Sequence, residues 1–400
     1  MKKGWQTKLL GEVLEKTETV NPLQSPNSEF DYIDVSSVSN TTFEIQETQR
    51  LKGKDAPSRA RKLVRTNDVI FATIRPTLQR IAVVPKHLDK QVCSTGYFVL
   101  RPNQGIDHRF VFYSLFTENF SAQMESLQKG ASYPAVTDGD VRAQEIPVPP
   151  LAEQQRIVGL LDEAFEGIAT AKANAKKNLQ NARALFESHL QSVFTQHGPG
   201  WVEKSIGELC ERLHQGLNTA GEKVKFYESG YPIIQTRNIN DGVVELDSKM
   251  KFMSEEDWQL YKDKYRPEVG DVFFTNIGTI GKTSIVTTDR DYLIHWNIFK
   301  LRPLLGRITP EFLRYTLEQL TVSGYFEKLQ KGGTVDFVTK KMISEALILL
   351  PTIAEQKTIV AKLDDLREET QRLARLYERK LSALEALKRS LLHQAFTGEL

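Results

Sequence analysis

The stretch Pro149–Val158 reads PPLAEQQRIV, and it returns as PTIAEQKTIV at Pro351–Val360, a shift of 202 residues. The same shift carries the LQKG of Leu127–Gly130 onto Leu329–Gly332. Closer to the start of each half the shift drifts by a few residues, as small loop insertions would cause. A chain of 400 residues is long enough for two or more domains. The repeat therefore predicts two similar halves of about 200 residues, each a globular part followed by a helix.

The globular parts, residues 1–150 and 197–350, mix strand-like and helix-like patterns. Short runs rich in β-branched and aromatic residues predict strands, and they lie at Val69–Ile74, Tyr97–Leu100, Asp271–Thr275 and Ser284–Thr288. Apolar residues at helical spacing predict helices near Arg109–Leu127 and Pro310–Leu329. We therefore predict a mixed α/β (α+β) fold for each globular part.

Each globular part ends at prolines, and a long run poor in proline and glycine follows, at 151–196 and 351–400. In the second run, steps of three and four residues give an a/d heptad seam broken only at Thr370 and Lys380. The full seam is Leu363, Leu366, Thr370, Leu373, Tyr377, Lys380, Leu384, Leu387 and Leu391. The first run makes the same steps with smaller residues, at Ile157, Leu161, Ala164, Ile168, Ala171, Ala175, Asn178, Ala182 and Leu185.

Large side chains on one seam and small ones on the other favour close pairing of the two helices. The alternative is two separate amphipathic helices, each packed on its own domain. At about 1.5 Å per residue, forty-odd residues form a helix of roughly 60 Å. We therefore predict that the pair is a strut that holds the globular parts apart.

Composition limits the class of protein only loosely. The chain has 40% hydrophobic and 26% charged residues, so we expect buried cores and a soluble protein, and its net charge of +2 indicates no partner. Cys93 and Cys210 form no CxxC pattern, which favours a reduced, cytoplasmic protein. The first residues lack the apolar region of a signal peptide, and no apolar run reaches the roughly 18 residues of a transmembrane helix.

The stretch Asn276–Thr283, NIGTIGKT, resembles a nucleotide-binding P-loop because it ends in Gly-Lys-Thr. A P-loop begins with a glycine five residues before its second glycine, and here that position is Asn276. A P-loop also runs into a helix that holds the phosphate, whereas Ser284–Thr288 is strand-like. The matching segment of the first half, about Thr73–Arg80, has neither glycine nor lysine. We interpret this stretch as a turn between two strands.

Other catalytic or metal-binding patterns are missing from the sequence. The seven histidines form no HExxH and no close pairing with cysteine. The acidic pairs Asp162-Glu163 and Asp364-Asp365 lie near the starts of the long helices, where carboxylates suit the helix dipole. We therefore predict that the chain is not an enzyme, with no catalytic residue, no metal site and no cofactor of its own.

Basic and amide-rich segments at matching places in both halves predict DNA binding. Arg50–Arg65 carries seven basic residues and one acidic residue, which suits a loop on a phosphate backbone. Arg, Lys, Asn and Gln are also the side chains that read base edges. In the first half the candidates are Arg59, Arg61, Lys62, Arg65, Arg75, Arg80, Lys129 and Tyr133. In the second half they are Arg237, Asn238, Asn240, Asn276, Lys282, Thr283, Trp296, Asn297, Lys331 and Thr334.

Over its whole length the chain resembles the specificity (S) subunits of Type I restriction-modification enzymes, HsdS. The resemblance rests on the two Pro-x-x-x-Glu-Gln elements before long helices, the LQKG pair, GDVFF at 270–274 and QAFTGEL at 394–400. Gly-Thr-Ile-Gly-Lys at 278–282 is itself a common turn in the target-recognition domains of this family. The recognition residues of the family follow no fixed motif, so the DNA candidates above rest on charge, residue type and position alone.

The resemblance implies a domain organisation and a set of partners. Residues 1–150 and 197–350 would be two target-recognition domains, each reading one half of a split sequence in double-stranded DNA. The helices at 151–196 and 351–400 would pack antiparallel, set the spacing and dock two methyltransferase subunits, and restriction subunits would join the complex. S-adenosylmethionine, ATP and Mg²⁺ would bind those partners. Candidates for the methyltransferase or helix interface are Glu153, Gln154, Ile157, Leu161, Glu355, Gln356, Ile359 and Leu363.

Two other hypotheses remain open at this point. Gly281-Lys282-Thr283 would suit a P-loop nucleotide hydrolase, and loss of ATP hydrolysis on Lys282→Ala would reveal it. The near-neutral charge would suit a coiled-coil scaffold that binds proteins. Charge reversal at Arg59, Arg61, Lys62 and Arg65 distinguishes this scaffold from a DNA-binding subunit, because a scaffold would keep its DNA affinity unchanged.

Overall fold

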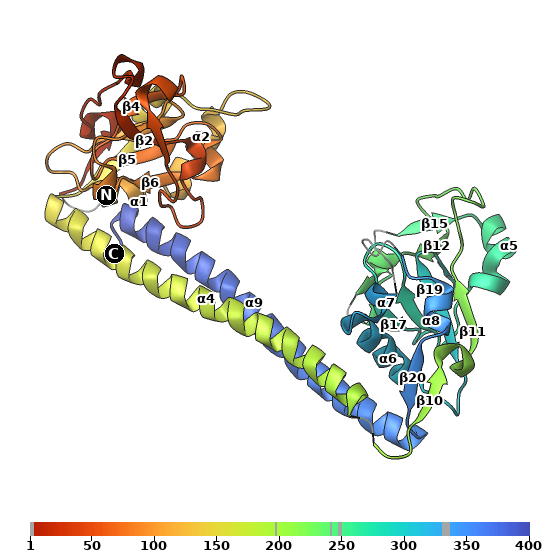
Figure 1. Cartoon of the computed structure of the whole chain (residues 1–400). Helices are drawn as coiled ribbons and strands as arrows, with labels where there is room; N and C mark the ends of the chain where they lie inside the picture. Colours follow the sequence, from red (N-terminus) through yellow and green to blue (C-terminus); the bar gives the residue numbers. More distant parts are fainter. Residues whose placement is uncertain (1–3, 197, 241, 247–249, 330–336) are drawn as a thin grey trace. The chain divides into compact units, whose positions relative to one another are not determined.

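The computed structural model describes residues 4–196, 198–240, 242–246, 250–329 and 337–400. The chain forms two compact units (Figure 1). The first unit contains Met1–Lys176 and Glu378–Leu400, and the second contains Lys177–Tyr377. Each unit has one mixed α/β domain and part of each of two long helices, α4 (Leu151–Thr195) and α9 (Ile353–Thr397). The predicted fold class is confirmed.

In the first unit the domain is built on three small sheets. Strand β1 (Gln6–Leu9) pairs antiparallel with β9 (Glu145–Val148) beside the start of α4. A four-stranded sheet has the order β3 (Gln49–Lys52), β2 (Glu29–Ile33), β7 (Val92–Ser94), β4 (Ala60–Leu63). A three-stranded antiparallel sheet has the order β6 (Ile81–Val83), β5 (Val69–Ala72), β8 (Tyr97–Leu100). The helices are α1 (His108–Ser114), α2 (Glu118–Leu127) and α3 (Asp138–Arg142).

The second unit repeats this plan with additions. Strand β10 (Val202–Ser205) pairs antiparallel with β20 (Leu347–Leu350). The larger sheets have the orders β11 (Cys210–Gln215), β19 (Ile298–Pro303), β16 (Val272–Thr275), β17 (Thr283–Ile285), and β15 (Lys251–Met253), β12 (Tyr231–Ile234), β18 (Leu293–Ile294). Strands β13 (Ile239–Asn240) and β14 (Val243–Val244) form a short hairpin. The helices are α5 (Glu255–Tyr265), α6 (Pro310–Val322), α7 (Tyr325–Lys328) and α8 (Lys340–Ser344).

The central strands of both domains are buried on both faces. All four residues of β5 and all four of β16 are buried, which explains why these runs are apolar without alternation. The two predicted helices are each broken in two. Thr117 caps α2 by accepting a hydrogen bond from the Phe120 backbone N–H at 3.3 Å, and Gly324, with φ of 69°, separates α6 from α7. The helical spacing of apolar residues did not reveal either break, because the apolar face continues across both.

A buried glutamine fixes the start of each long helix to its domain. The Gln154 side chain is fully buried, accepts from the Asp107 backbone N–H at 2.8 Å, and donates to the Pro149 carbonyl at 2.8 Å and the Gly105 carbonyl at 3.3 Å. Gln356 repeats this arrangement with the Thr309 N–H and the carbonyls of Pro351 and Arg307. We call each arrangement a glutamine clamp. The repeated Glu-Gln motif therefore joins a helix to a domain in each half.

The two long helices pack against each other in both units. In the first unit the early part of α4 and the late part of α9 share one core, which contains Ile157, Leu161 and Leu392. In the second unit Leu190, late in α4, shares a core with Leu363, early in α9. The helices therefore run antiparallel (Figure 1), and the alternative of two separate helices, each packed on its own domain, is wrong.

The predicted heptad seam is too strict at its ends. Leu185 and Leu387 keep 52% and 47% of their surface exposed, while their neighbours Phe186 and Lys388 turn toward the partner helix. A straight α-helix drifts by about 20° per heptad relative to a repeat of 3.5 residues per turn. The contact stripe has therefore moved by one residue at these positions.

Candidate nucleic-acid interface

The most exposed sequence-predicted pair in the first unit is Arg75 with Tyr133. The guanidinium of Arg75 lies over the Tyr133 ring, with Cζ 5.2 Å from the ring centroid, and 72% of the Tyr133 surface is exposed. These residues are 58 positions apart in the sequence, and the fold brings them together. A cation stacked on an exposed ring offers both a phosphate contact and a flat apolar surface for a base or sugar.

Backbone contacts hold this pair at the edge of the domain. Tyr133 lies on the loop between α2 and α3, which projects from the first unit (Figure 1). The Arg75 backbone N–H donates to the Pro134 carbonyl at 2.7 Å, and Lys129 and Ala135 form an isolated β-bridge that closes the loop. Arg75 itself has a left-handed backbone with φ of 50°, an uncommon conformation for arginine. The exposed Lys129 lies at the base of the same loop.

Two other basic candidates of the first half make internal contacts, so they are corrections to the predicted interface. Lys62 donates to the Tyr97 carbonyl at 2.6 Å and pairs with Asp138 at 2.7 Å, with 17% of its side chain exposed. Arg80 donates to the carbonyls of Ser36 and Val38. Positive charges satisfied in this way are not available to DNA.

Arg61, Arg65 and Arg59 differ in how far they reach solvent. The guanidinium of Arg61 donates to the Ala60 carbonyl at 3.0 Å, and its side chain is half-buried. Arg65 pairs with Glu18 although half of its side chain remains exposed. Arg59 is exposed, and its backbone carbonyl accepts from the Thr95 N–H at 2.8 Å. Of these three, Arg59 remains the best placed for a phosphate.

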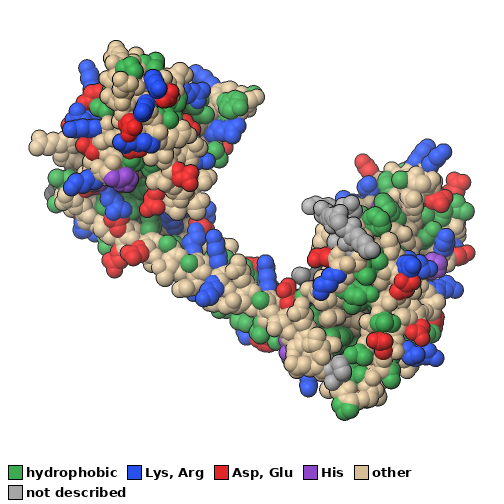
Figure 2. All heavy atoms as spheres, in the orientation of Figure 1, with side chains coloured by type: hydrophobic (Ala, Val, Ile, Leu, Met, Phe, Trp, Pro, Cys, Tyr) green, Lys and Arg blue, Asp and Glu red, His purple; other side chains and the backbone are tan. Residues whose placement is uncertain are grey.

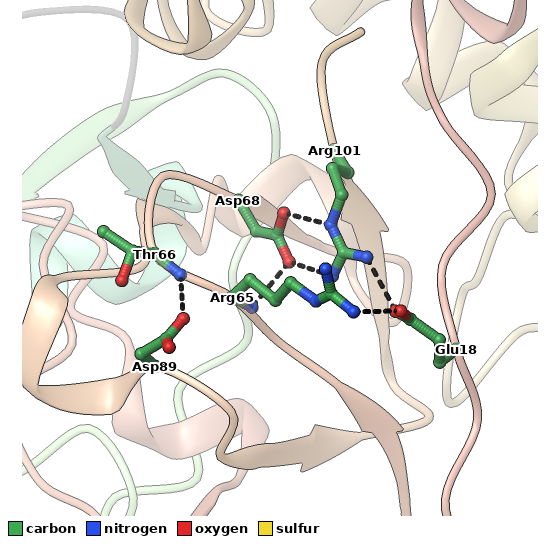
Figure 3. A network of polar contacts seen from close by, with 6 residues as sticks. All are labelled: Glu18, Arg65, Thr66, Asp68, Asp89 and Arg101. Carbon is green, nitrogen blue, oxygen red and sulfur yellow. Dashed lines mark hydrogen bonds and ion pairs between the residues drawn. The ribbon is translucent and has the colours of Figure 1, made fainter.

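A polar network that sequence reasoning missed connects this basic segment to the sheet (Figure 3). Arg101 forms two hydrogen bonds with the buried Asp68 carboxylate, both at 2.8 Å, and a third with Glu18 at 2.6 Å. The hydrogen bond from Arg101 lowers the pKa of Glu18. The Thr66 backbone N–H donates to Asp89 at 2.9 Å, and this bond lowers the pKa of that carboxylate.

The second unit has the equivalent of the central pair. Arg302 forms bonds of 2.8 and 3.0 Å with the buried Asp271 carboxylate, and Arg302 also pairs with Glu268. The repeated Asp-Val and Arg-Pro dipeptides, at 68–69 with 271–272 and at 101–102 with 302–303, could have revealed both pairs from the sequence. In each domain this ion pair fixes the start of the central strand to the end of its neighbour.

In the second unit, candidates from two segments meet around Lys282. Its ammonium donates to the Asn240 side-chain carbonyl at 2.8 Å, and the Asn240 amide donates to Glu245 at 2.8 Å. Arg237, next to this cluster in sequence, is exposed. Lys282 and Asn240 are both half-buried. The polar surface here is therefore formed by the hydrogen-bonded Lys282 ammonium, the Asn240 amide and the exposed Arg237.

Three amide and hydroxyl candidates of the second unit are buried and are corrections. Asn238 is 3% exposed and accepts from the Gln235 backbone N–H at 3.0 Å, which caps a short turn. Thr283 is 4% exposed and donates to Glu318 at 2.7 Å. Asn276 is 1% exposed, and its side-chain carbonyl has no hydrogen-bond partner among the described residues.

The remaining candidates of the second half divide between exposed and undescribed positions. Trp296 keeps 37% of its surface exposed, and the adjacent Asn297 side chain lies 2.9 Å from the His295 ring nitrogen. The predictions at Lys331 and Thr334 lie outside the described residues. Trp296 is thus one exposed aromatic ring of the second domain, beside Tyr227 at 50% and Phe337 at 51%.

The NIGTIGKT stretch connects β16 to β17, which pair antiparallel, so the predicted turn between strands is confirmed. The N–H groups that a P-loop would direct at phosphate are used internally, because Gly281 donates to the Thr275 carbonyl and Lys282 to the Thr275 hydroxyl, both at 2.9 Å. Gly281 has φ of 90°, and an added Cβ would lie 2.3 Å from the Thr321 side chain. Glycine is therefore required here for backbone conformation and for packing.

Most of the side chains predicted for the methyltransferase or helix interface face their own unit. Gln154 and Gln356 are fully buried in the glutamine clamps, so they cannot touch a partner and are corrections. Ile157 and Leu161 are buried in the core that α4 shares with α9 in the first unit. Leu363 is buried in the corresponding core of the second unit, with Ile359 partly buried against it. Glu153 pairs with Arg156 at 2.7 Å, and Glu355 accepts from the Thr352 backbone N–H at 3.0 Å.

Charge and thiol chemistry are consistent with a binding surface made of local loops. Lys and Arg side chains are interspersed with Asp and Glu over each unit on the face in view (Figure 2).

Burial raises the pKa of both Cys93 and Cys210 to about 12, so both thiols stay protonated near neutral pH. Within the described ranges, no three acidic, histidine or cysteine side chains gather as a metal site, and no helix is long and apolar enough to cross a membrane.

Comparison with known proteins identifies the family. Residues 2–181 and 199–378 each match the model of the Type I restriction modification DNA specificity domain, and the chain therefore belongs to this family. The resemblance to Type I specificity subunits predicted from the sequence is thus confirmed, and each half carries one DNA specificity domain.

Solved structures and curated relatives agree with this assignment. The chain is 31% identical to the HsdS subunit from Thermoanaerobacter tengcongensis, with a TM-score of 0.69 and coverage of 100% of this chain and 98% of that one. It is also 31% identical to a chain of a type I R-M system, solved in work on complex assembly and conformational transition, with a TM-score of 0.86 and coverage of 100% and 99%.

The curated relatives are more distant. The specificity subunit of the EcoBI enzyme of Escherichia coli is 25% identical over 280 residues, which are 64% of this chain. The EcoKI specificity subunit of Escherichia coli strain K12 is 24% identical over 341 residues, 77% of this chain and 69% of that one. The chain spans 58% of the length of the EcoBI protein.

Proposed function

We propose that the chain is a non-catalytic subunit that gives a Type I restriction-modification complex its DNA sequence specificity. Each α/β domain would read one half of a bipartite duplex target. The observation that carries the proposal is the duplicated domain, fixed to its helix by the same glutamine clamp in both halves but presenting different exposed groups. These groups are Arg75 with Tyr133 in the first domain, and Arg237 and Trp296, beside the half-buried Lys282, in the second.

The same proposal assigns roles to the helices and to the partners. The paired α4 and α9 would set the distance between half-sites, and their exposed faces would dock two methyltransferase subunits. S-adenosylmethionine, ATP and Mg²⁺ would be bound by the methyltransferase and restriction subunits, and the complex would work in the cytoplasm. The buried positions of Gln154, Leu161, Gln356 and Leu363 direct the search for a docking surface to the solvent faces of the helices instead.

The test is to co-express the chain with its methyltransferase partner and to map methylated bases across the genome. We expect methylation at a two-part motif with a constant gap. Replacing residues 1–150 with the corresponding domain of another family member should change one half of the motif and leave the other half and the gap unchanged. Absence of methylation at any bipartite motif, with the complex assembled, would refute the proposal.

The same preparation tests the two rival functions. A nucleotide hydrolase would show ATP turnover by the isolated chain that is lost on Lys282→Ala. A protein-binding scaffold would keep the DNA affinity of the assembled complex when Arg59 and Arg75, both exposed, are changed to glutamate. We expect no turnover, and weaker DNA binding that is more pronounced at low salt.

A further inference from the structure

Each unit contains one contact between a cation and an aromatic ring that joins α4 to α9. In the first unit the Lys388 ammonium lies 5.0 Å from the centroid of the Phe165 ring. In the second unit the Arg367 guanidinium lies 4.4 Å from the centroid of the Phe186 ring. Both rings belong to α4 and both cations belong to α9.

The internal repeat makes these two contacts equivalent. A shift of 202 residues carries Phe165 onto Arg367 and Phe186 onto Lys388. The same pair of positions is therefore occupied in both units, but ring and cation have changed places relative to the repeat. In the first unit the ring follows its own domain in sequence, whereas in the second unit the cation does.

This distribution matters because α4 and α9 are repeats of each other, so each could in principle pair with a second copy of itself. Two antiparallel copies of α4 in the same register would place Phe165 against Phe186 and lose both cation contacts. Two copies of α9 would place Arg367 against Lys388, so both cations would lose their α4 rings and face a like charge, which Glu318, the partner of Arg367, offsets in part.

A salt bridge of the first unit adds to the same discrimination. Lys172 of α4 pairs with Glu385 of α9. The position of α4 that is equivalent to Glu385 is Arg183. Two copies of α4 would therefore bring Lys172 close to Arg183, again a pair of like charges in place of an ion pair.

We propose that the placing of both rings on α4 and both cations on α9 makes these helices select each other and reject a second copy of themselves. This selection acts whenever separated halves of the chain, or neighbouring copies of it, could pair with the same helix. It works together with the complementary bulk of the two seams, because Ala175 and Ala182 of α4 are small and buried.

The experiment uses the full chain with a protease site inserted between Thr195, where α4 ends, and Val202, where β10 begins. The chain is cleaved after purification, unfolded in denaturant and refolded, so that equal amounts of the two halves choose partners freely. Native mass spectrometry then counts the heterodimer and both homodimers, with random pairing giving one heterodimer for every homodimer. For the native sequence we expect the ratio of heterodimer to homodimers to exceed the random value by about tenfold or more.

The decisive variant exchanges one contact, Phe165→Lys with Lys388→Phe. The ring and cation still meet inside the first unit, and the seams keep their bulk, yet both homotypic pairings now also join a ring to a cation. The ratio should fall severalfold toward random. Exchanging the second contact as well, Phe186→Arg with Arg367→Phe, places all cations on α4 and should restore the native ratio.

The pattern of loss and recovery separates selection from simple destabilisation, which would grow with each exchange. If the first exchange does not refold, the second exchange alone carries the same prediction of a ratio near random. A ratio that is equal in the native and singly exchanged chains would overturn the proposal. It would do so without affecting the proposed DNA specificity, which methylation mapping tests separately.

Discussion

Replacing Gln154 with methionine should loosen the first domain from its helix. Methionine matches the length of glutamine but cannot accept the Asp107 N–H or donate to the Pro149 carbonyl, each now bonded at 2.8 Å. The third partner, the Gly105 carbonyl, belongs to an exposed residue and can bind water instead. A buried polar group without a partner costs about 1–3 kcal/mol. Because the Asp107 N–H is only partly buried, the two groups together should cost about 3 kcal/mol.

Thermal unfolding and amide hydrogen exchange measure this effect. A loss of about 3 kcal/mol in a unit of roughly 200 residues should lower its Tm by about 6–12 °C. The Asp107 amide should exchange faster than in the native protein, since its acceptor is gone. Gln155→Met is the matched control, because Gln155 is the exposed neighbour on the same helix turn. Gln356→Met, with Lys357→Met as its control, repeats the test in the second unit.

The reasoning would be refuted if Gln154→Met had the same Tm as Gln155→Met and the Asp107 amide exchanged no faster than in the native protein. That result would mean that the packing of α4 alone holds the domain. A second readout concerns function. A loosened domain should reduce methylation by the assembled complex at both low and high DNA concentration, whereas the control should not.

Three other perturbations test the site and its supports. Arg75→Ala should weaken DNA binding by the assembled complex and reduce the slope of log affinity against log salt by about 0.9, whereas Lys62→Met should lower stability and leave that slope unchanged. Asp68→Asn leaves Arg101 buried with Glu18 as its remaining anion and should cost about 3 kcal/mol in denaturant unfolding, whereas Glu18→Gln at the exposed end should cost less. The pKa of Glu18 is lowered in the folded state, so its stabilisation is present above its ordinary value of 4.5 and is lost as pH falls below it. Urea unfolding of the native chain and Glu18→Gln should therefore converge at acid pH, and a constant difference would contradict this assignment.

The repeat made the architecture predictable. A shift of 202 residues located both domains, both long helices and the Glu-Gln element before knowledge of any contact. The NIGTIGKT turn was also predictable, because a P-loop demands a glycine and a following helix that are both missing. These features depend on the order of residues within short segments, so the sequence alone is enough to predict them.

The site was less predictable because exposure depends on distant residues. Lys62 and Thr283 have the residue types that bind DNA, yet Asp138 and Glu318, far away in sequence, hold them inside the domains. The pairing of Arg75 with Tyr133 likewise appears only once the α2–α3 loop is closed. The role of Gln154 was hidden for the same reason, since its partners lie before α1 and before α4.

The core of the first domain includes residues from the far end of the chain. The ring of Phe396 lies 4.8 Å from that of Phe110, and Phe194 packs on Phe312 in the same way at 5.3 Å. A recombination event that replaces the first half of the gene would therefore deliver a domain whose apolar core is still completed by the end of α9. The fitness of such hybrids should follow the match between α1 and the end of α9, and compensating substitutions should accumulate in the codons for that end of α9.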